Sequence, residues 1–147
     1  MRREQRDEPP RLTVEEDPRP EDVRFLEESL HRFNVEATGI ADGGFLGVFL
    51  RAADDAPVAG AFGWTWGGTC YLRHVYVSEG LRRQGHGTTL LKAVEAQARS
   101  CGCRQIMLET HDFQAPGFYR KLGFEVAARI ADYPRGHHYL TFLKRLG

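Results

Sequence analysis

The fold is decided by the stretch Val75-Tyr76-Val77-Ser78-Glu79-Gly80-Leu81-Arg82-Arg83-Gln84-Gly85-His86-Gly87-Thr88. An alternating apolar segment leads through a basic turn that contains glycine into the start of a helix. The first turn of a helix offers unpaired N–H groups and a partial positive charge, which suit phosphate oxygens. Glycine at 85 and 87 lets a ligand approach the backbone closely. The stretch therefore predicts an anion-binding turn.

Two familiar phosphate-binding motifs do not match this turn. A P-loop requires a lysine between its last glycine and the following hydroxyl residue, and here Gly87 is followed directly by Thr88. A dinucleotide-binding fingerprint requires a third glycine or an alanine, where this chain has Leu90. Taken alone, the turn is equally well interpreted as a basic loop that caps a helix.

The pattern on both sides of the turn predicts a mixed α+β fold. Alternating apolar residues indicate strands, and apolar residues at three- and four-residue steps indicate helices. A helix that links two strands also favours a parallel pair within the sheet. The expected strands are 45–51, 58–66, 69–77, 104–110, 124–130 and 138–143, with a further edge strand at 11–15, and the expected helices begin at 20 and span 87–100 and 116–122.

Composition limits the class of protein. A chain of 147 residues suits one domain, expected over 11–147 after a flexible arm at 1–10. Twenty basic residues balance twenty acidic ones, which argues against a nucleic-acid or membrane-surface partner. Residues 1–28 hold ten acidic residues and six arginines, so the remainder carries about four net positive charges. Cys70, Cys101 and Cys103 lack zinc-ligand spacing, and no metal is expected. A soluble, cytoplasmic protein fits best.

Two motifs resemble those of the GCN5-related N-acetyltransferase (GNAT) family. The run Arg82-x-x-Gly85-x-Gly87 after a strand is similar to the family's acyl-CoA loop. Further on, the chain resembles the family's second landmark, a short helix with an F/L-Y pair followed by K-x-G-F, in Ala115-Pro116-Gly117-Phe118-Tyr119-Arg120-Lys121-Leu122-Gly123-Phe124. The resemblance covers roughly residues 11–145. Some bacterial members also share a tail similar to residues 113–116 and 132–137.

The resemblance implies a fold and a co-substrate. The fold would be a mostly antiparallel sheet of six to seven strands with flanking helices and a splayed parallel pair, 69–77 and 104–110. Acetyl-CoA would lie between the two splayed strands, with its pyrophosphate on the N–H groups of the loop and its pantetheine arm on the strand backbone. The implied contacts are Val75, Val77, Arg82, Arg83, Gln84, Gly85, His86, Gly87, Thr88, Ala115, Phe118 and Asp112, where Asp112 replaces an asparagine common in the family.

The same resemblance assigns Tyr119 as the general acid that protonates the departing CoA thiolate. A phenol is a reasonable donor to a thiolate within hydrogen-bond reach. The general base stays open, because Tyr71 and Arg73 occupy the usual strand positions and neither is an ordinary base. The candidates that could act through water are Glu79, Glu109, His111, His137 and His138, and water connected to bulk solvent is an equal alternative. Strict alternation would turn His74 to the opposite face from Tyr71 and Arg73.

The expected reaction is direct transfer of an acetyl group from acetyl-CoA to a primary amine of a small molecule or peptide in a ternary complex. Alternation places Cys70 with His74 rather than with Val77, which argues against an acyl-enzyme. An acceptor pocket built from Trp64, Trp66, Tyr71, Phe33 and Tyr133 is the functional interpretation of those aromatic residues, and core packing is the alternative. The rival function is an acyl-CoA sensor without catalysis. A homodimer is common in the family.

Overall fold

A computed structural model describes residues 8–147, so most of the arm expected at 1–10 lies outside the described residues. The described chain divides into two compact units, residues 8–39 and 40–147. The described part of the first unit holds one helix, α1 (Pro20–Thr38). Pro20 occupies the first turn and two acidic residues follow it, as expected for the positive end of a helix. Gly39 ends the helix in the left-handed conformation, φ 71°, and its N–H donates to the Val35 carbonyl oxygen over 2.8 Å.

The expected edge strand at 11–15 is wrong. These residues form no strand, and the side chains of Leu12 and Val14 are 91% and 92% exposed. Two apolar residues among charged neighbours bury too little surface to offset the entropy of ordering a strand. The predicted helix that follows is confirmed, although none of its residues is buried.

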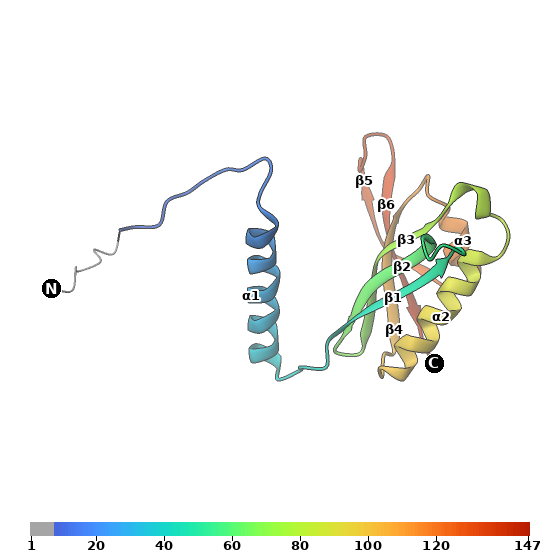
Figure 1. The fold of residues 1–147 in the computed structure, drawn as a ribbon, viewed down its shortest axis with the longest axis horizontal. Coiled ribbons are helices and arrows are strands. Elements are labelled where there is room, and N and C mark those ends of the chain that lie inside the picture. The colour runs from blue at the N-terminus through green and yellow to red at the C-terminus, as the bar shows by residue number, and fades with distance from the viewer. Residues whose placement is uncertain (1–7) are drawn as a thin grey trace. The chain divides into compact units, whose positions relative to one another are not determined.

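The second unit is built on a six-stranded sheet, in the spatial order β1-β2-β3-β4-β6-β5 (Figure 1). Every neighbouring pair is antiparallel except β3 and β4, so the predicted mixed sheet with one parallel pair is confirmed. The strands are β1 (Gly44–Arg51), β2 (Pro57–Trp66), β3 (Thr69–Val77), β4 (Gln105–His111), β5 (Glu125–Ala131) and β6 (His138–Arg145).

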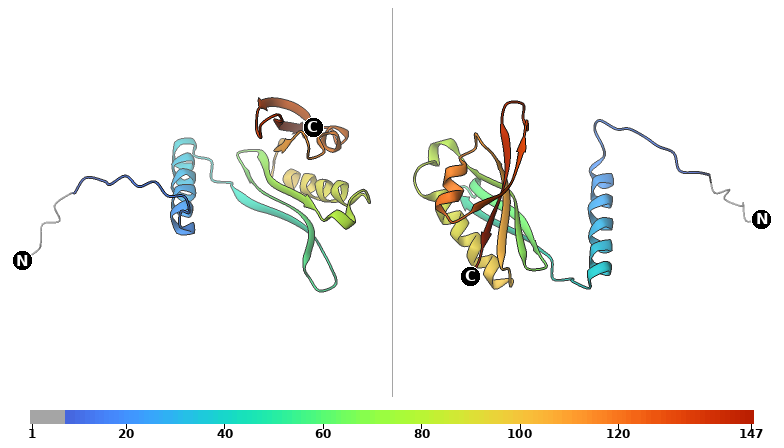
Figure 2. Two further views of the ribbon diagram at one scale, coloured as in Figure 1. Left: turned by 90° about the horizontal axis from the view of Figure 1, so that it is seen from above. Right: turned by 180° about the vertical axis from the view of Figure 1, so that it is seen from behind.

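Two helices and a short 3-10 turn complete the unit: η1 (Glu79–Leu81), α2 (His86–Ser100) and α3 (Pro116–Lys121). Helix α2 contacts β1, β2 and β3, and Figure 2 shows it against one side of the sheet. Its predicted apolar stripe is confirmed as the buried set Leu90, Leu91, Val94 and Ala98. These side chains meet the buried residues of the strands, and the opposite face of the sheet carries the polar and aromatic side chains discussed below.

The parallel pair is short. Pairing between β3 and β4 runs from Thr69 opposite Gln105 to Leu72 opposite Leu108 and goes no further, although both strands continue. The two strands therefore part after Leu72 and Leu108, as the resemblance implied.

A bulge in β3 lies at the same level as this parting. Phe62 pairs with His74 and Gly63 with Leu72, so Arg73 has no partner on β2. One extra residue shifts the alternation of side chains along the strand. As a result Tyr71 and His74 lie on the same face of the sheet, opposite Trp64 and Phe62 of β2.

The bulge corrects two predictions that assumed strict alternation. His74 shares the face of Tyr71, whereas it was expected on the other face. Cys70 shares the face of Val75 and Val77, whereas it was expected with His74. Cys70 is fully buried, and this burial raises the pKa of its thiol to about 12, so the residue stays a neutral thiol and is a poor nucleophile.

Gly63 makes the bulge possible, because a Cβ at this position would collide with the carbonyl oxygen of Tyr71. We expect Gly63→Ala to lower the free energy of unfolding by about 1–3 kcal/mol, since the strands must separate to admit a methyl group. Gly44→Ala is the matched control, because a Cβ there meets nothing within 4 Å. Urea unfolding of both variants measures the difference. Equal stabilities would contradict the close approach of β2 and β3.

Candidate active site

The basic turn follows β3 directly and leads into α2. Gly85 is the residue before the helix, in the left-handed conformation with φ 83°, and a Cβ there would meet nothing within 4 Å. Its carbonyl oxygen accepts the backbone N–H and the hydroxyl of Thr89, each at 3.1 Å. The N–H groups of His86, Gly87 and Thr88 belong to the first turn, where a helix provides no acceptors. The predicted start of a helix at this turn is confirmed, and its anion-binding role stays a prediction.

The side chains of this turn divide into two kinds. Arg82 folds back, because its Nε donates to the Val77 carbonyl oxygen over 2.9 Å and its guanidinium lies 5.6 Å from the centre of the Tyr76 ring. Gln84 donates from Nε2 to the Gly80 carbonyl oxygen over 3.0 Å. Arg83, in contrast, is exposed and has a positive φ of 63°. Within residues 8–147 it forms no ion pair. Arg83 is therefore the freer positive charge of the turn.

The second predicted motif lies beside the first. Ala115 precedes α3 in the left-handed conformation, φ 78°, with Pro116 in the first turn. A Cβ at Gly87 would lie 3.0 Å from Cζ of Phe118, so the start of α2 and α3 pack closely. Val75 and Val77 pack their side chains against the core, which leaves their backbone as the part of β3 available to a ligand.

Tyr119 lies in α3 with 8% of its surface exposed, and its ring packs against those of Phe118, Phe124 and Phe142 at 5.1–5.8 Å. Burial raises the pKa of its phenol to about 12. Tyr119 therefore keeps its proton at neutral pH, as a proton donor must.

The point where β3 and β4 part carries a carboxylate. Glu109 is the first residue of β4 beyond the last pair, and it accepts a hydrogen bond of 2.6 Å from the hydroxyl of Tyr71. Tyr71 in turn packs edge-on against Trp64, with ring centres 5.1 Å apart. Burial and the hydrogen bond to Glu109 raise the pKa of Tyr71 to about 12. Burial, followed by the charge of Glu109, also raises the pKa of Tyr139.

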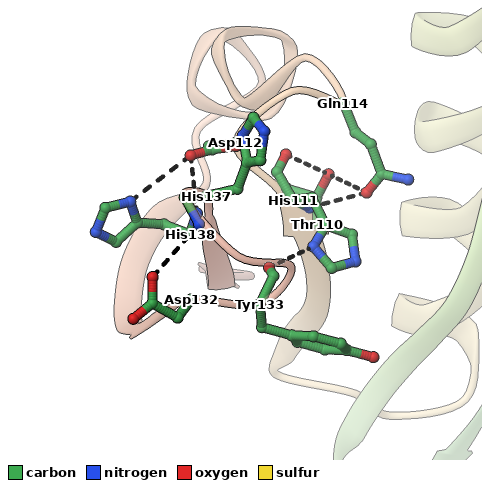
Figure 3. Close-up of polar contacts among 9 residues, drawn as sticks. Thr110, His111, Asp112, Gln114, Asp132, Tyr133, His137 and His138 are labelled. Atoms are coloured by element: carbon green, nitrogen blue, oxygen red, sulfur yellow. Dashed lines mark hydrogen bonds and ion pairs between the residues drawn. The ribbon is translucent and has the colours of Figure 1, made fainter.

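Asp112 fastens the hairpin that joins β5 to β6 (Figure 3). Its carboxylate accepts the backbone N–H of His138 over 2.8 Å and lies 2.9 Å from Nδ1 of His137, and its own N–H donates to the His138 carbonyl oxygen. Desolvation acts to raise the pKa of this carboxyl, but the contacts with His138 and His137 hold it below its usual value. The polar atoms of Asp112 are thus occupied by this hairpin, and its predicted contact with CoA stays a prediction.

His111 is placed within an aromatic cluster. Its Nδ1–H donates to the Tyr133 carbonyl oxygen over 3.0 Å. Its ring lies 4.6 Å from that of Tyr139, 5.0 Å from Tyr133 and 5.2 Å from Phe113. Sequence reasoning had not singled out Tyr139. Its position opposite His111 in the β4–β6 register, together with alternation along β6, is the signal that finds it.

The remaining predicted residues lie apart. Trp66 donates from Nε1 to the Ile40 carbonyl oxygen over 2.9 Å at the far end of β2, Phe33 belongs to the first unit, and Glu79 is exposed in η1. Cys70, Cys101 and Cys103 are free thiols. Within residues 8–147 there is no cluster of three or more potential metal ligands. Among the helices of the same residues, none has both the length and the apolar character needed to cross a bilayer.

Three known proteins can be compared with this arrangement. A blasticidin-S acetyltransferase of Streptomyces morookaense is 43% identical over 74 residues, which are 50% of this chain and 52% of that protein. The match thus spans about half the length of that relative. The crystal structure of an acetyltransferase from Bacillus cereus has a TM-score of 0.75 at 25% identity, covering 91% of this chain and 98% of that one.

A further solved structure shares the fold at 17% identity. It is a candidate streptothricin acetyltransferase from Bacillus anthracis in complex with acetyl coenzyme A, with a TM-score of 0.62 over 70% of this chain and 63% of that one. The model of the acetyltransferase (GNAT) family matches residues 3–124. Since this match covers most of the chain, and the sheet with its one parting parallel pair agrees with it, the chain belongs to the GNAT family of acetyltransferases.

Proposed function

We propose that the protein is an N-acetyltransferase that moves an acetyl group from acetyl-CoA to a primary amine by direct attack in a ternary complex. The observation that carries the proposal is the parting of β3 and β4, with the open turn of α2 at the end of β3 and Glu109 at the point of divergence. The neighbour solved with acetyl coenzyme A supports the choice of co-substrate. The reaction joins the amine nitrogen to the acetyl carbon and breaks the carbon–sulfur bond.

The CoA pyrophosphate is assigned to the turn from Arg82 to Thr88. The open space at Gly85, the free N–H groups of the first turn of α2 and the exposed Arg83 support this assignment. Ala115 and Phe118 bring α3 against the same turn, so they are assigned to the adjacent part of CoA. The pantetheine arm would pair with the backbone of Val75 and Val77.

We expect Gly85→Glu to weaken CoA binding at least about a hundredfold, because a carboxylate beside the pyrophosphate is repelled at short range. Gly44→Glu adds the same charge where a side chain has open space, so it serves as the control. Calorimetric titration with CoA measures both, after thermal unfolding has shown that each variant is folded. Unchanged affinity in Gly85→Glu would reject the assignment of the turn.

Tyr119 is assigned as the general acid that protonates the departing thiolate. We expect Tyr119→Phe to lower kcat by about 10²–10⁴-fold while CoA affinity changes little, because only the hydroxyl is lost and the ring contacts remain. With a pKa of about 12, Tyr119 stays protonated from pH 7 to 10, so its ionisation should not lower kcat in that range. Release of free thiol measures the rate, and a variant with undiminished kcat would exclude this role.

Glu109 is assigned as the base, among the five candidates that the sequence left open. Asp112 contacts the imidazole of His137 and the backbone N–H of His138, His111 lies two residues beyond Glu109 at the end of β4, and Glu79 lies on the exposed turn η1. Glu109 alone of these stands at the point of divergence. It would accept, through water, the proton that the ammonium group must lose before its nitrogen attacks. Removing that proton at pH 7 costs an alkylamine about 4–5 kcal/mol.

The pH profile tests this assignment. We expect Glu109→Gln to lower kcat at pH 7 by about 10²-fold or more, and to recover much of it near pH 10, where the free amine is already abundant. His74→Gln is the comparison variant, on the same face but in the neighbouring strand. A loss in Glu109→Gln that is equal at all pH values would show that Glu109 is not the base.

A sensor that binds acetyl-CoA without catalysis is the rival function. A panel of amines that includes blasticidin S, chosen because of the relative's name, separates the two. An enzyme releases thiol with at least one amine in the panel, whereas a sensor binds CoA and releases none.

A further inference from the structure

The face of the sheet around Glu109 is lined by aromatic rings from four segments of the chain. Trp64 comes from β2, Tyr71 from β3, Tyr139 from β6, and Tyr133 from the hairpin between β5 and β6. These four rings and the carboxylate of Glu109 form what we term the Glu109 cluster.

Contacts run through the whole cluster. Trp64 and Tyr71 lie 5.1 Å apart between ring centres, and the Tyr71 hydroxyl is 2.6 Å from Oε1 of Glu109. On the other side, Tyr133 and Tyr139 lie 4.9 Å apart. The register of the sheet places the side chains of Tyr71, Glu109 and Tyr139 on one face, since Leu108, Leu140 and Phe142 point into the core on the other.

Glu109 lacks a cationic partner. Within residues 8–147 its carboxylate forms no ion pair, and the groups that hydrogen-bond to it are the neutral phenols of Tyr71, at 2.6 Å, and of Tyr139. The positive charge of Arg73 acts to lower the pKa values of Tyr71 and Tyr139. Arg73 forms no ion pair with Glu109. The negative charge of Glu109 also raises the pKa values of both tyrosines, after the effect of their burial. A half-buried carboxylate in this state is stabilised by any cation that reaches it.

The aromatic rings of the cluster also attract cations, in addition to the carboxylate of Glu109. The face of an aromatic ring carries a negative partial charge, so a cation within about 6 Å of its centre is stabilised. Tyr133 is 56% exposed, so it offers surface to a ligand. In Figure 3 its side chain points away from Asp112, while its backbone is held by His111 and the hairpin is fastened by Asp112.

We propose that the Glu109 cluster binds a positively charged amine group of the acceptor, so that the substrate class is an alkylamine that is protonated when it binds. This inference rests on the proposed function, because it assigns the acceptor of the same reaction. The cation would lie against the carboxylate of Glu109 and the rings, and the acceptor would lose its proton only after it has bound. Arylamines, which are neutral at pH 7, and acceptors with a carboxylate next to the amine would bind weakly.

A probe that cannot be acetylated on nitrogen separates this proposal from the chemistry. Choline carries a permanent charge, and 3,3-dimethylbutan-1-ol has the same shape with carbon in place of the charged nitrogen. We expect NMR titration of the full chain, with CoA present, to show choline binding at least about tenfold more tightly than the neutral alcohol. Shifts of the Trp64 indole signal would report the location.

Variants at Tyr133 provide a graded test. Tyr133→Leu should weaken choline binding about threefold to thirtyfold, whereas Tyr133→Phe keeps the ring and should bind almost normally. Phe49→Leu removes another exposed ring from the same sheet, at the far end of β1, and should have no effect. The wild-type protein and Tyr133→Leu should differ in KM for an alkylamine more than in kcat.

The outcomes distinguish the two proposals. Equal affinities for choline and the neutral alcohol, in a protein that does acetylate amines, would overturn the cation site and leave the proposed function standing. Selective choline binding that Tyr133→Leu weakens, in a protein that releases no thiol with any amine, would support the cation site and count against the proposed function. Equal loss of choline binding in Tyr133→Leu and Phe49→Leu would also overturn the assignment.

Discussion

The arrangement of this site depends on one constraint, the early end of the parallel pairing between β3 and β4. Four residue pairs join the strands, and beyond Leu72 and Leu108 the backbone groups that face each other are no longer paired across the gap. Buried N–H and C=O groups require partners, so such a gap suits an extended ligand with amide groups of its own. The basic turn begins at the end of β3, and Glu109 is the first residue of the unpaired part of β4. In the proposed complex, the phosphate end and the reacting end of CoA would therefore lie at different points along this gap.

The bulge at Arg73 determines which side chains reach that gap. Without it, alternation along β3 would place Cys70 and His74 on one face. With it, Tyr71 and His74 share the open face, while Cys70 joins Val75 and Val77 in the core. The close approach of Gly63 to the Tyr71 carbonyl allows the extra residue to be accommodated. The same local irregularity therefore brings His74 to the face of Tyr71 and Glu109, and turns Val75 and Val77 to the face of Cys70.

Much of the fold was predictable from local sequence patterns. Every strand in the second unit begins and ends within about two residues of its predicted bounds, because alternation and glycine turns are local signals. The bulge was not predictable in this way, since it depends on the partner strand. The pair formed by Tyr71 and Glu109 also joins residues 38 positions apart, through a parallel register that only the folded sheet reveals. The weak alternation at Leu12 and Val14 predicted a strand that does not form, because two exposed apolar residues bury too little surface to order one.

We propose that the thioester lies where β3 and β4 part, between Tyr119 as the acid and Glu109 as the base. The most direct measurement is a crystal structure of the protein with acetyl-CoA. We predict the pantetheine arm along the backbone of Val75 and Val77, and the sulfur within about 3.5 Å of the Tyr119 hydroxyl, as a sulfur hydrogen bond requires. Acetyl-CoA bound elsewhere on the sheet, or a sulfur beyond the reach of Tyr119 with the strands still paired only to Leu72 and Leu108, would contradict the account.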